Sequence, residues 1–466
     1  MSRLVIKFGG TSVGSADAIR QAAAIAHDLR AAGHAVIVVT SAMSGVTDLL
    51  PAGSQAAARA ELGRFLEIAS SIRRKHVDAA QALFADAGQR ARALDPIDQR
   101  LNELSRLAEA LAVLGEASPR ALDAVASLGE RMSIHLLARA IEALGSPAVP
   151  VEATCFVRTD GVHQSAVPDM TVTHALAHQH LLPLVERGTI PVITGFIGAT
   201  EAGVVTTLGR GGSDYSAAIA GAALDADEVW IYTDVDGVMT ADPRVVGDVR
   251  TLERVSYREM SELAYFGAKV LHPKTVLPAL ERGIPIRIRN TFNPTHPGTL
   301  VTANGESASG HLQGVTSIEK QSLVTIEGRG MLGVPGIAAR AFAAVARTGT
   351  SVPMISQSSS EQSICFAVPQ AAVARVVSAL REAFDRELAR RDIENITSQD
   401  DVVVVTVVGA AIRNTPGVAG RIFTAVGEGA INVIAIAMGS SECSISLVVD
   451  GPHAREAVRQ IHRLLA

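Results

Sequence analysis

Residues 4–39 read LVIKFGGTSVGSADAIRQAAAIAHDLRAAGHAVIVV, and this stretch decides the fold class. A short apolar run ends at a pair of glycines, helical spacing of apolar residues follows from Ser15 to Gly33, and a continuous β-branched run begins at Ala35. An uninterrupted apolar strand is typical of a sheet that is buried on both faces. Strand, helix and buried strand in succession predict a βαβ unit and a parallel sheet, so the fold class is α/β.

The same alternation continues towards the middle of the chain. Buried-strand runs recur at 190–196 and 228–233, and the Ala-, Leu- and Arg-rich stretch 55–145 has the periodicity of a helical layer. The small polar run TANGESASG (302–310) is the best linker candidate in the sequence. We therefore expect one α/β domain over 1–301, followed by this linker.

An internal repeat lies beyond the linker. Residues 335–368 align without gaps on residues 416–449, and roughly fifteen of the paired positions are identical. Each copy has the order strand, Pro-Gly loop, helix, strand, Ser-rich turn, strand and helix, a βαββα unit of the ferredoxin-like kind. We expect one module over 311–396 and a second over 397–466. An extra strand near 312–318 would complete the second module and interleave the two.

Composition and charge exclude several classes of protein. The 466 residues are 48% hydrophobic and 19% charged, which provides ample apolar surface for sizeable cores and argues against disorder. The net charge of −5, without a basic block, makes nucleic acid and an anionic membrane poor partners. Three scattered cysteines predict neither a disulfide nor a cysteine-built metal site. Because no signal-like segment and no long apolar run occurs, we expect a cytoplasmic protein.

The turn KFGGTSVG (7–14) has the features of a phosphate-binding loop. Its glycines let backbone N–H groups approach a polyanion, and the helix that follows adds its dipole. Lys7 precedes the glycines and can meet a terminal phosphate. The lysine that a Walker A motif carries after its last glycine is absent. A glycine-rich turn also needs no ligand, so a purely structural role stays open.

A second glycine-rich turn, TTLGRGGSDYSAA (206–218), also opens a helix. The guanidinium of Arg210 can bind a small carboxylate through two parallel hydrogen bonds, and Asp214 can hold a lysine or a metal in place. The alternative is that Ser213 is a helix N-cap and that the charges beside it are incidental.

Two further motifs follow. The run VWIYTDVDGVMTADPR (229–244) places Thr233 and Asp234 at the carboxyl end of a buried strand, the edge at which open α/β sheets bind ligands. Its acids lack the spacing of a calcium loop, and a solvated turn is the alternative. In FGAKVLHPKT (266–275), Lys269 follows a glycine turn.

Taken together and in this order, the motifs resemble those of aspartokinases, which have the amino-acid kinase fold. The resemblance rests on KFGGTSVG, SLGERMS (127–133), TLGRGGSDYSAA, TDVDGVMTADPR and FGAKVLHPKT. In the repeat, QSSSEQSI (357–364) and GSSECSI (439–445) resemble the regulatory ACT domains of the same enzymes. The match is closest to the kinase half of bifunctional aspartokinase–homoserine dehydrogenases. Because no dehydrogenase follows Ala466, the expectation is a monofunctional aspartokinase.

The resemblance implies transfer of the γ-phosphoryl group of ATP, accompanied by Mg²⁺, to the side-chain carboxylate of L-aspartate. The product is 4-phospho-L-aspartate, the first step towards lysine, threonine and methionine. An aspartate side chain with a pKa near ~4 is already ionised at neutral pH, so the reaction needs no general base. Alignment of the reactants and cationic screening of the phosphoryl group suffice.

The resemblance also assigns roles to residues. Lys7 neutralises the transferring phosphoryl group and Asp214 orients Lys7, which makes these two the catalytic pair. Arg210 holds the α-carboxylate of aspartate and Glu130 its ammonium group, while further substrate contacts come from Ser41, Thr47 and Ser213. The ATP site is formed by Lys7, Gly9, Gly10, Thr233, Asp234, Met239, Arg244, Lys269 and Val270. At position 239, aspartokinases commonly carry tyrosine, so a phenol hydrogen bond is lost.

The paired ACT modules imply an amino-acid effector bound between modules or chains, and such sites favour a homodimer or a higher homo-oligomer. Threonine is the favoured effector and lysine the second. The candidate contacts are Ile355, Gln357, Asn414 and Ile436. Met438 stands where the family often has a second glutamine. Modules that only dimerise the enzyme are the alternative.

Two other patterns do not predict sites. GRGMLG (328–333) matches GxGxxG, but the second repeat copy keeps only one of these glycines, which favours a plain loop over a dinucleotide site. His174, His178 and His180 have helix spacing, but no glutamate follows the first histidine as HExxH requires, so no metal site is expected. An amino-acid kinase with another acceptor, and a catalytically silent amino-acid sensor, remain as alternatives for the whole chain.

Overall fold

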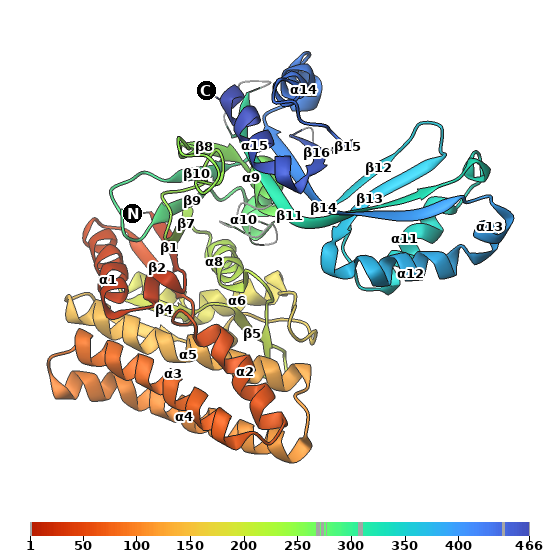
Figure 1. Cartoon of the computed structure of the whole chain (residues 1–466). Coiled ribbons are helices and arrows are strands. Elements are labelled where there is room, and N and C mark those ends of the chain that lie inside the picture. The colour runs from red at the N-terminus through yellow and green to blue at the C-terminus, as the bar shows by residue number, and fades with distance from the viewer. Residues whose placement is uncertain are drawn as a thin grey trace. The chain divides into compact units, whose positions relative to one another are not determined.

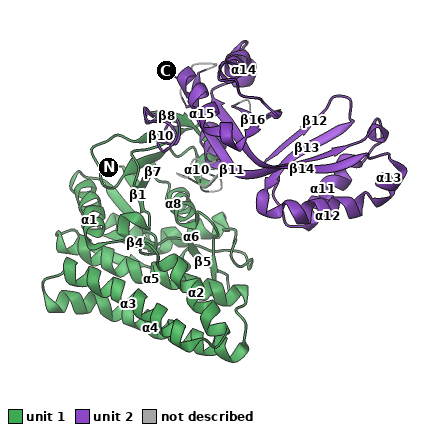
Figure 2. Ribbon diagram, viewed as in Figure 1, with its two compact units in different colours: residues 1–238, 253–257, 270–304 green, residues 239–252, 258–269, 305–466 purple. Residues whose placement is uncertain are grey.

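The computed structural model describes residues 2–266, 271, 275, 277–305, 311–439 and 443–465 (Figure 1). Tertiary contacts divide the chain into two compact units (Figure 2). Unit 1 comprises residues 1–238, 253–257 and 270–304, and unit 2 comprises residues 239–252, 258–269 and 305–466.

These units differ from the domain limits expected from the sequence in two respects, the first being that residues 302–304 of the expected linker belong to unit 1. Residues 239–252 and 258–269 fall inside the expected domain 1–301, yet they group by contacts with unit 2. Residues 306–310 of the expected linker lie outside the described part of the chain. The domain limits therefore stay a prediction.

The core of unit 1 is an eight-stranded sheet with the order β3-β4-β2-β1-β7-β9-β10-β8. The first six strands in this order are parallel, β10 runs antiparallel to β9, and β8 runs parallel to β10. The strands are β1 (Arg3–Phe8), β2 (Ala35–Thr40), β3 (Ala148–Val151), β4 (Ile190–Thr194), β7 (Glu228–Thr233), β8 (Arg254–Ser256), β9 (Ile286–Asn290) and β10 (Thr299–Thr302). The predicted α/β fold with a mainly parallel central sheet is confirmed.

Helices cover both faces of this sheet. They are α1 (Ala16–Ala31), α2 (Val46–Ala58), α3 (Leu62–Leu83), α4 (Ala87–Leu114), α5 (Pro119–Ala143), α6 (Met170–His180), α7 (Leu182–Glu186), α8 (Gly212–Ala223) and α10 (Leu277–Arg282), and a hairpin joins β5 (Ile197–Ala199) to β6 (Val205–Thr207). Helices α3, α4 and α5 lie beside one another in the layer predicted over 55–145 (Figure 1). Helix α8, nearly all small residues, packs against β1 and β7.

The period-2 alternation of β1 separates its core side chains from Lys7. Leu4, Ile6 and Phe8 belong to the hydrophobic core that β1 shares with α1 and α5. Because successive side chains of a strand point to opposite faces, Val5 and Lys7 face the other side, where α8 lies. The strand register thus directs Lys7 towards the N-terminal end of α8.

Unit 2 is built on a six-stranded antiparallel sheet with the order β12-β13-β11-β14-β16-β15. Its strands are β11 (Leu312–Glu327), β12 (Met354–Gln357), β13 (Ser363–Pro369), β14 (Asn395–Gly409), β15 (Ala435–Met438) and β16 (Ser444–Asp450). Its helices are α9 (Tyr257–Tyr265), α11 (Ile337–Arg347), α12 (Val373–Ala383), α13 (Asp385–Arg390), α14 (Val418–Glu428) and α15 (Ala454–His462). The first residue of α9, Tyr257, is assigned to unit 1, and the rest of this helix belongs to unit 2. Each repeat copy contributes a helix and two strands, in the predicted order.

The two modules share their two longest strands. Residues 312–318 of β11 pair with 404–409 of β14, beside β16 and β15 of the second module. Residues 321–327 of β11 pair instead with β13 and with 395–402 of β14. The extra strand expected near 312–318 therefore completes the second module from a strand that continues into the first.

The glycines of GRGMLG are explained by close packing of the backbone. A Cβ at Gly328 would lie 2.3 Å from the carbonyl oxygen of Asp392, and one at Gly330 would lie 2.5 Å from the Cα of Asp392. The segment forms a three-residue 3₁₀ turn, Arg329–Met331, before α11. The plain-loop interpretation accounts for this motif.

Candidate active site

Lys7 and Asp214 form an ion pair at the carboxyl edge of the parallel sheet. The Lys7 Nζ lies 2.5 Å from Asp214 Oδ1, and Lys7 is 8% exposed. Strand β1 positions Lys7 between Val39 of β2 and Ile231 of β7, while Asp214 belongs to the first turn of α8. The structure thus brings together the two side chains that the sequence predicts as the catalytic pair, from positions 207 residues apart.

The N-terminus of α8 is built from glycine rather than from a capping side chain. Gly211 is the N-cap, with a left-handed φ of 73°, and no side chain caps the helix. Ser213 lies inside the first turn, so the alternative that it is the N-cap is wrong. A Cβ at Gly195 would lie 2.8 Å from the Cβ of Ser213, which shows how closely this turn meets the end of β4. The N–H of Gly212 donates to the carbonyl of Gly209 at 3.0 Å, so the N–H groups of Ser213 and Asp214 are the ones that could bind an anion.

Arg210 lies in the loop between β6 and α8 and is exposed. Among the described residues, none forms an ion pair or hydrogen bond with its guanidinium group. Its neighbours Gly209 and Gly211 both have positive φ, so the loop carries Arg210 on a tight glycine turn. The side chain is available for an external carboxylate.

Gly9 and Gly10 bring the β1 turn against the loop that follows β2. The N–H of Gly9 donates to the carbonyl of Tyr232 at 3.3 Å, and a Cβ at Gly9 would lie 3.3 Å from Lys7 Nζ. A Cβ at Gly10 would lie 3.4 Å from the carbonyl oxygen of Ala42. The absence of side chains at these glycines leaves space beside the ammonium group of Lys7.

Glu130 is a buried carboxyl group beside the same loop. It lies in α5, is 3% exposed, and has a hydrogen bond from the backbone of Ala42. Burial raises the pKa of Glu130 from its ordinary 4.5 to about 8, although the backbone hydrogen bonds act in the opposite direction. The preceding Gly129 permits this approach, because a Cβ there would lie 2.8 Å from the Cβ of Ala42.

Ser41 lies in the loop that follows β2, and Thr47 lies at the start of α2. The N–H of Ser41 donates to the carbonyl of Phe8 at 3.1 Å, and Ser133 Oγ donates to the carbonyl of Ser41 at 2.6 Å. Thr47 is exposed in the first turn of α2. The Ser41 backbone is therefore fixed between β1 and α5, next to Glu130.

The predicted nucleotide residues fall into three groups. Thr233 ends β7 at the same carboxyl edge as Lys7, Asp234 follows it, and Thr233 Oγ1 donates to Asp234 Oδ1 at 3.1 Å. Met239 and Arg244 belong to unit 2, and Arg244 is exposed and pairs with Asp242 at 2.6 Å. Lys269 and Val270 lie outside the described residues.

Asp123 is a buried carboxylate that the sequence analysis missed. It is 1% exposed in α5 and accepts hydrogen bonds from His163 Nδ1 at 2.7 Å, from Thr207 Oγ1 at 2.7 Å and from the N–H of Gln164. The carbonyl oxygen of Gln164 would lie 2.8 Å from a Cβ at Gly209. Asp123 thereby holds the loop beneath Arg210. An acidic residue in the middle of an apolar helical stretch was the available signal.

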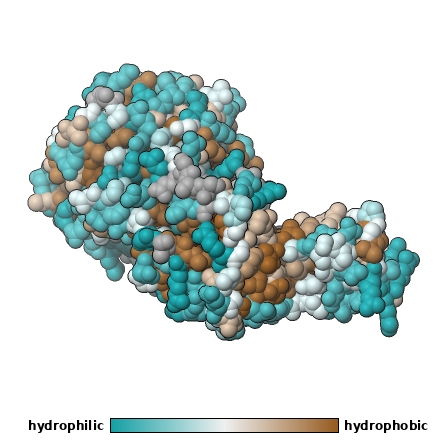
Figure 3. All heavy atoms as spheres, turned by 90° about the horizontal axis from the view of Figure 1, so that it is seen from above, coloured by the Kyte–Doolittle hydropathy of each residue, from teal (hydrophilic) through white to brown (hydrophobic). Residues whose placement is uncertain are grey.

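The predicted effector residues lie on or near the edge strands of unit 2. Ile355 and Gln357 are exposed on β12, and Ile436 is exposed on β15. Asn414 is exposed before α14. In the space-filling view, apolar surface gathers over the sheet that contains β12, β13 and β14 (Figure 3). Two of the predicted effector residues are apolar and exposed: the exposed fraction is 47% for Ile355 and 44% for Ile436.

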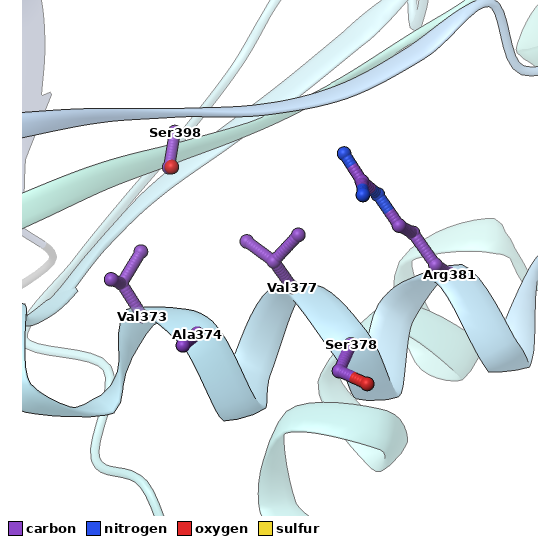
Figure 4. A pocket seen from close by; sticks show the side chains of 6 residues that line it. All are labelled: Val373, Ala374, Val377, Ser378, Arg381 and Ser398. Atoms are coloured by element: carbon purple, nitrogen blue, oxygen red, sulfur yellow. The ribbon is translucent and has the colours of Figure 1, made fainter.

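A separate pocket of about 390 Å³ lies in the first module of unit 2. Val377 and Arg381 rise from α12 towards the strand that carries Ser398 (Figure 4). None of the sequence motifs contributes to this pocket, so it plays no part in the candidate active site.

The family comparisons agree with this arrangement. Residues 2–290 match the model of the amino acid kinase family, and residues 324–384 and 405–465 match an ACT domain model. The chain belongs to the amino acid kinase family and carries ACT domains after its kinase domain. None of the described helices combines the length and apolar character that crossing a membrane requires.

Individual relatives place the chain near the aspartokinases. It is 37% identical over 467 residues to the bifunctional aspartokinase/homoserine dehydrogenase 1 of Zea mays. This alignment covers 98% of the chain and 50% of the relative. The chain thus spans about half the length of the curated relatives it matches first.

Two crystal structures of E. coli aspartokinase III are similar over the whole length. The complex with aspartate and ADP, an R-state, has a TM-score of 0.81 at 31% identity, and the complex with lysine and aspartate, a T-state, has a TM-score of 0.80 at 32% identity. Each comparison covers 99% of both chains. The resemblance to aspartokinases expected from the motifs is confirmed.

Proposed function

We propose that this chain transfers the γ-phosphoryl group of ATP to the side-chain carboxylate of L-aspartate. The observation that carries the proposal is the Lys7–Asp214 ion pair at the carboxyl edge of the parallel sheet, bordered by the open backbone of Gly9. The similarity to E. coli aspartokinase III, whose crystal structure holds aspartate and ADP, supports the choice of substrates.

Phosphoryl transfer to this carboxylate requires screening of negative charge and does not require a general base. The attacking carboxylate is ionised at neutral pH, so no proton has to be removed before it attacks phosphorus. The ammonium group of Lys7 stabilises the charge on the transferring phosphoryl oxygens, and Asp214 fixes the direction of that ammonium group. The backbone N–H of Gly10 and the N-terminus of α8 add further positive potential, whereas the N–H of Gly9 is bonded to the carbonyl of Tyr232.

Recognition of the amino acid divides between two side chains of opposite charge. Arg210, free of intramolecular partners among the described residues, binds the α-carboxylate in a bidentate manner. Glu130 binds the α-ammonium group. Because burial raises the pKa of Glu130 to about 8 when no cation lies beside it, the arriving ammonium group converts it to the carboxylate. Ser41, Thr47 and Ser213 complete the substrate contacts.

Mg²⁺ fits as a companion of ATP. Within the described part of the sheet's carboxyl edge, no three His, Cys, Asp or Glu side chains cluster as a ready-made metal site. Mg²⁺ characteristically keeps water and phosphate ligands and needs only one or two carboxylates, such as Asp234. When bound, it would neutralise charge on the phosphate oxygens.

Regulation by an amino acid through the paired ACT modules extends the proposal. Threonine is the favoured effector, from the resemblance to bifunctional enzymes, and lysine is the second, since lysine is bound in the T-state structure of E. coli aspartokinase III. Gln357 and Ile355 on β12, with Asn414 and Ile436 of the second module, are the proposed contacts. A homodimer formed through these modules is the proposed assembly.

The test is ADP release from MgATP by the full chain, with L-aspartate, D-aspartate, L-glutamate or no acceptor. The proposal expects turnover with L-aspartate alone, and suppression of that turnover by threonine or lysine. Turnover with another acceptor in place of L-aspartate would assign the chain to a different amino-acid kinase. A folded chain without acceptor-dependent ADP would favour the sensor alternative.

A further inference from the structure

Three potential metal ligands meet on unit 1 outside the proposed active site. His174 and His178 come from α6, and Asp225 follows the last turn of α8. The ligand atoms of the three side chains all lie within 4.8 Å of one another. The sequence shows the two histidines, but only the packing of α6 on α8 adds the carboxylate.

The local structure brings all three groups close together. The i, i+4 spacing places both histidines on one face of α6, and their rings stack with centroids 4.2 Å apart. Asp225 has a left-handed φ of 48° immediately after α8. Its Oδ2 lies 3.6 Å from His174 Nε2 and 3.8 Å from His178 Nε2.

These separations suit a bound ion better than a hydrogen bond. A hydrogen bond between nitrogen and oxygen requires about 2.7–3.2 Å, so neither histidine forms one with Asp225. Four-coordinate zinc with bonds of about 2.0–2.2 Å holds its ligand atoms roughly 3.4 Å apart, within a few tenths of an ångström of the two separations here.

A second observation points to an occupant. The Nε2 atom of His178 is shielded from solvent, although 35% of the side chain is exposed, and among the described atoms it has no hydrogen-bond partner. A shielded nitrogen without a hydrogen-bond partner costs free energy of folding. This nitrogen lies 3.8 Å from the carboxylate oxygen Oδ2 of Asp225, and a metal ion could lie between the two atoms. A cation between Nε2 and Oδ2 would satisfy both atoms.

The donor set also selects the kind of ion. Two imidazoles and one carboxylate favour zinc and neighbouring transition metals over Mg²⁺ or Ca²⁺, which prefer oxygen ligands. Arg282 Nη1 lies 3.5 Å from Asp225 Oδ1, which orients the carboxylate and leaves Oδ2 for the ion. The positive charge of Arg282 lowers the affinity of the site for a cation.

We propose that His174, His178 and Asp225 bind one divalent transition-metal ion, typified by Zn²⁺, and that this ion fastens α6 to the C-terminal end of α8. Asp214 lies at the opposite end of α8, roughly 16 Å away at 1.5 Å per residue. The ion therefore stabilises the helix that carries Asp214 without touching the reacting groups. This site is independent of the proposed kinase activity.

The test uses the full chain after treatment with a chelator. Zn²⁺ binding is measured by calorimetry, Co²⁺ binding by its absorption spectrum, and the thermal midpoint with and without Zn²⁺. We expect one equivalent of metal and a rise in the midpoint. His178→Ala and Asp225→Asn should each weaken binding at least about 10- to 100-fold, because even outer-shell partners have effects of that size. His180→Ala, on the same helix but outside the cluster, is the matched control and should bind like the parent chain.

The outcomes separate the proposal from its rivals. Parent-like Zn²⁺ affinity in Asp225→Asn, which preserves the size of the side chain, would overturn it. Loss of Zn²⁺ binding in His180→Ala would also overturn it. The same holds if the parent chain binds Zn²⁺ no more tightly than the double variant His174→Ala/His178→Ala. The thermal midpoints of the metal-free variants show whether a loss of binding reflects unfolding, and Asp225→Asn decides the question if a histidine variant is unstable.

Discussion

The proposed substrate role of Glu130 and its effect on stability can be separated by the substitution Glu130→Gln. The pKa of the buried carboxyl group is raised from 4.5 to about 8, so the folded chain prefers the protonated form. Stability from this group is fully present below about pH 4.5 and declines as the pH rises to about 8. At 1.36 kcal/mol per pKa unit, the loss is about 1 kcal/mol at pH 5.5 and about 4 kcal/mol at pH 8.

Glutamine keeps the size of the side chain and cannot ionise, so the free energy of unfolding of the variant does not fall with rising pH through this group. We expect Glu130→Gln to be more stable than the parent at pH 8, by up to about 4 kcal/mol, and by only about 1 kcal/mol at pH 5.5. The same substitution removes a charged partner of the ammonium group. At about 1.5–3 kcal/mol for such a hydrogen bond, the aspartate KM should rise roughly 10- to 150-fold.

Urea unfolding at pH 5.5 and 8 measures the first effect, and aspartate titrations of ADP release measure the second. Glu109→Gln, an exposed glutamate on α4, is the matched control and should change neither quantity. The parent's aspartate affinity should also rise between pH 6 and 8, whereas that of Glu130→Gln should not. An unchanged KM together with a parent-like pH dependence of unfolding would refute both the burial argument and the substrate role.

Three further substitutions test other parts of the site. Lys7→Met should lower kcat by about 10²–10³-fold with a smaller change in aspartate KM, and near-parental kcat in steady-state assays would remove Lys7 from phosphoryl transfer. Arg210→Ala should raise the aspartate KM roughly 10- to 150-fold and leave the ATP KM unchanged, because a carboxylate partner is lost; a selective change in ATP KM would assign Arg210 to the nucleotide instead. Asp123→Ala should lower the free energy of unfolding by about 2–4 kcal/mol, since its buried donors lose their acceptor, and a change under about 0.5 kcal/mol in urea unfolding would contradict that account.

Local sequence patterns predicted the elements that surround the active site. The glycine turns, the buried strands and the residue alternation of β1 depend on short-range rules, so their positions could be expected from the sequence. The shared strands of unit 2 were foreseeable for another reason. The second repeat copy lacked a final strand, and 312–318 was an unassigned strand pattern nearby.

Features that depend on long-range packing were not predictable. The run TDVDGVMTADPR is continuous in sequence, but its contacts divide after Val238, and the remainder groups with unit 2. One reason is that Thr240 Oγ1 and His462 Nε2 form a buried hydrogen bond of 2.9 Å, across 222 residues of sequence. Asp225 likewise joins His174 and His178 only through the packing of two helices, so the histidine motif alone favoured a solvated face.

Ser213 shows where a local rule gave the wrong alternative. Serine before an Ala-rich run is a good N-cap by preference. Two glycines preceding it allow the chain to enter α8 earlier, at Gly211 with positive φ, and this frees the helix N-terminus. Backbone conformation at glycine outweighed the side-chain preference.

The most direct test of the central claim is the identity of the phosphorylated product. Acyl phosphates react with hydroxylamine to give hydroxamates, so the full chain is incubated with MgATP, L-aspartate and hydroxylamine, with Lys7→Met in parallel. The account predicts the β-hydroxamate of L-aspartate in an amount equal to the ADP formed, and a strongly reduced yield from Lys7→Met. ADP accompanied only by inorganic phosphate, with no hydroxamate, would contradict it.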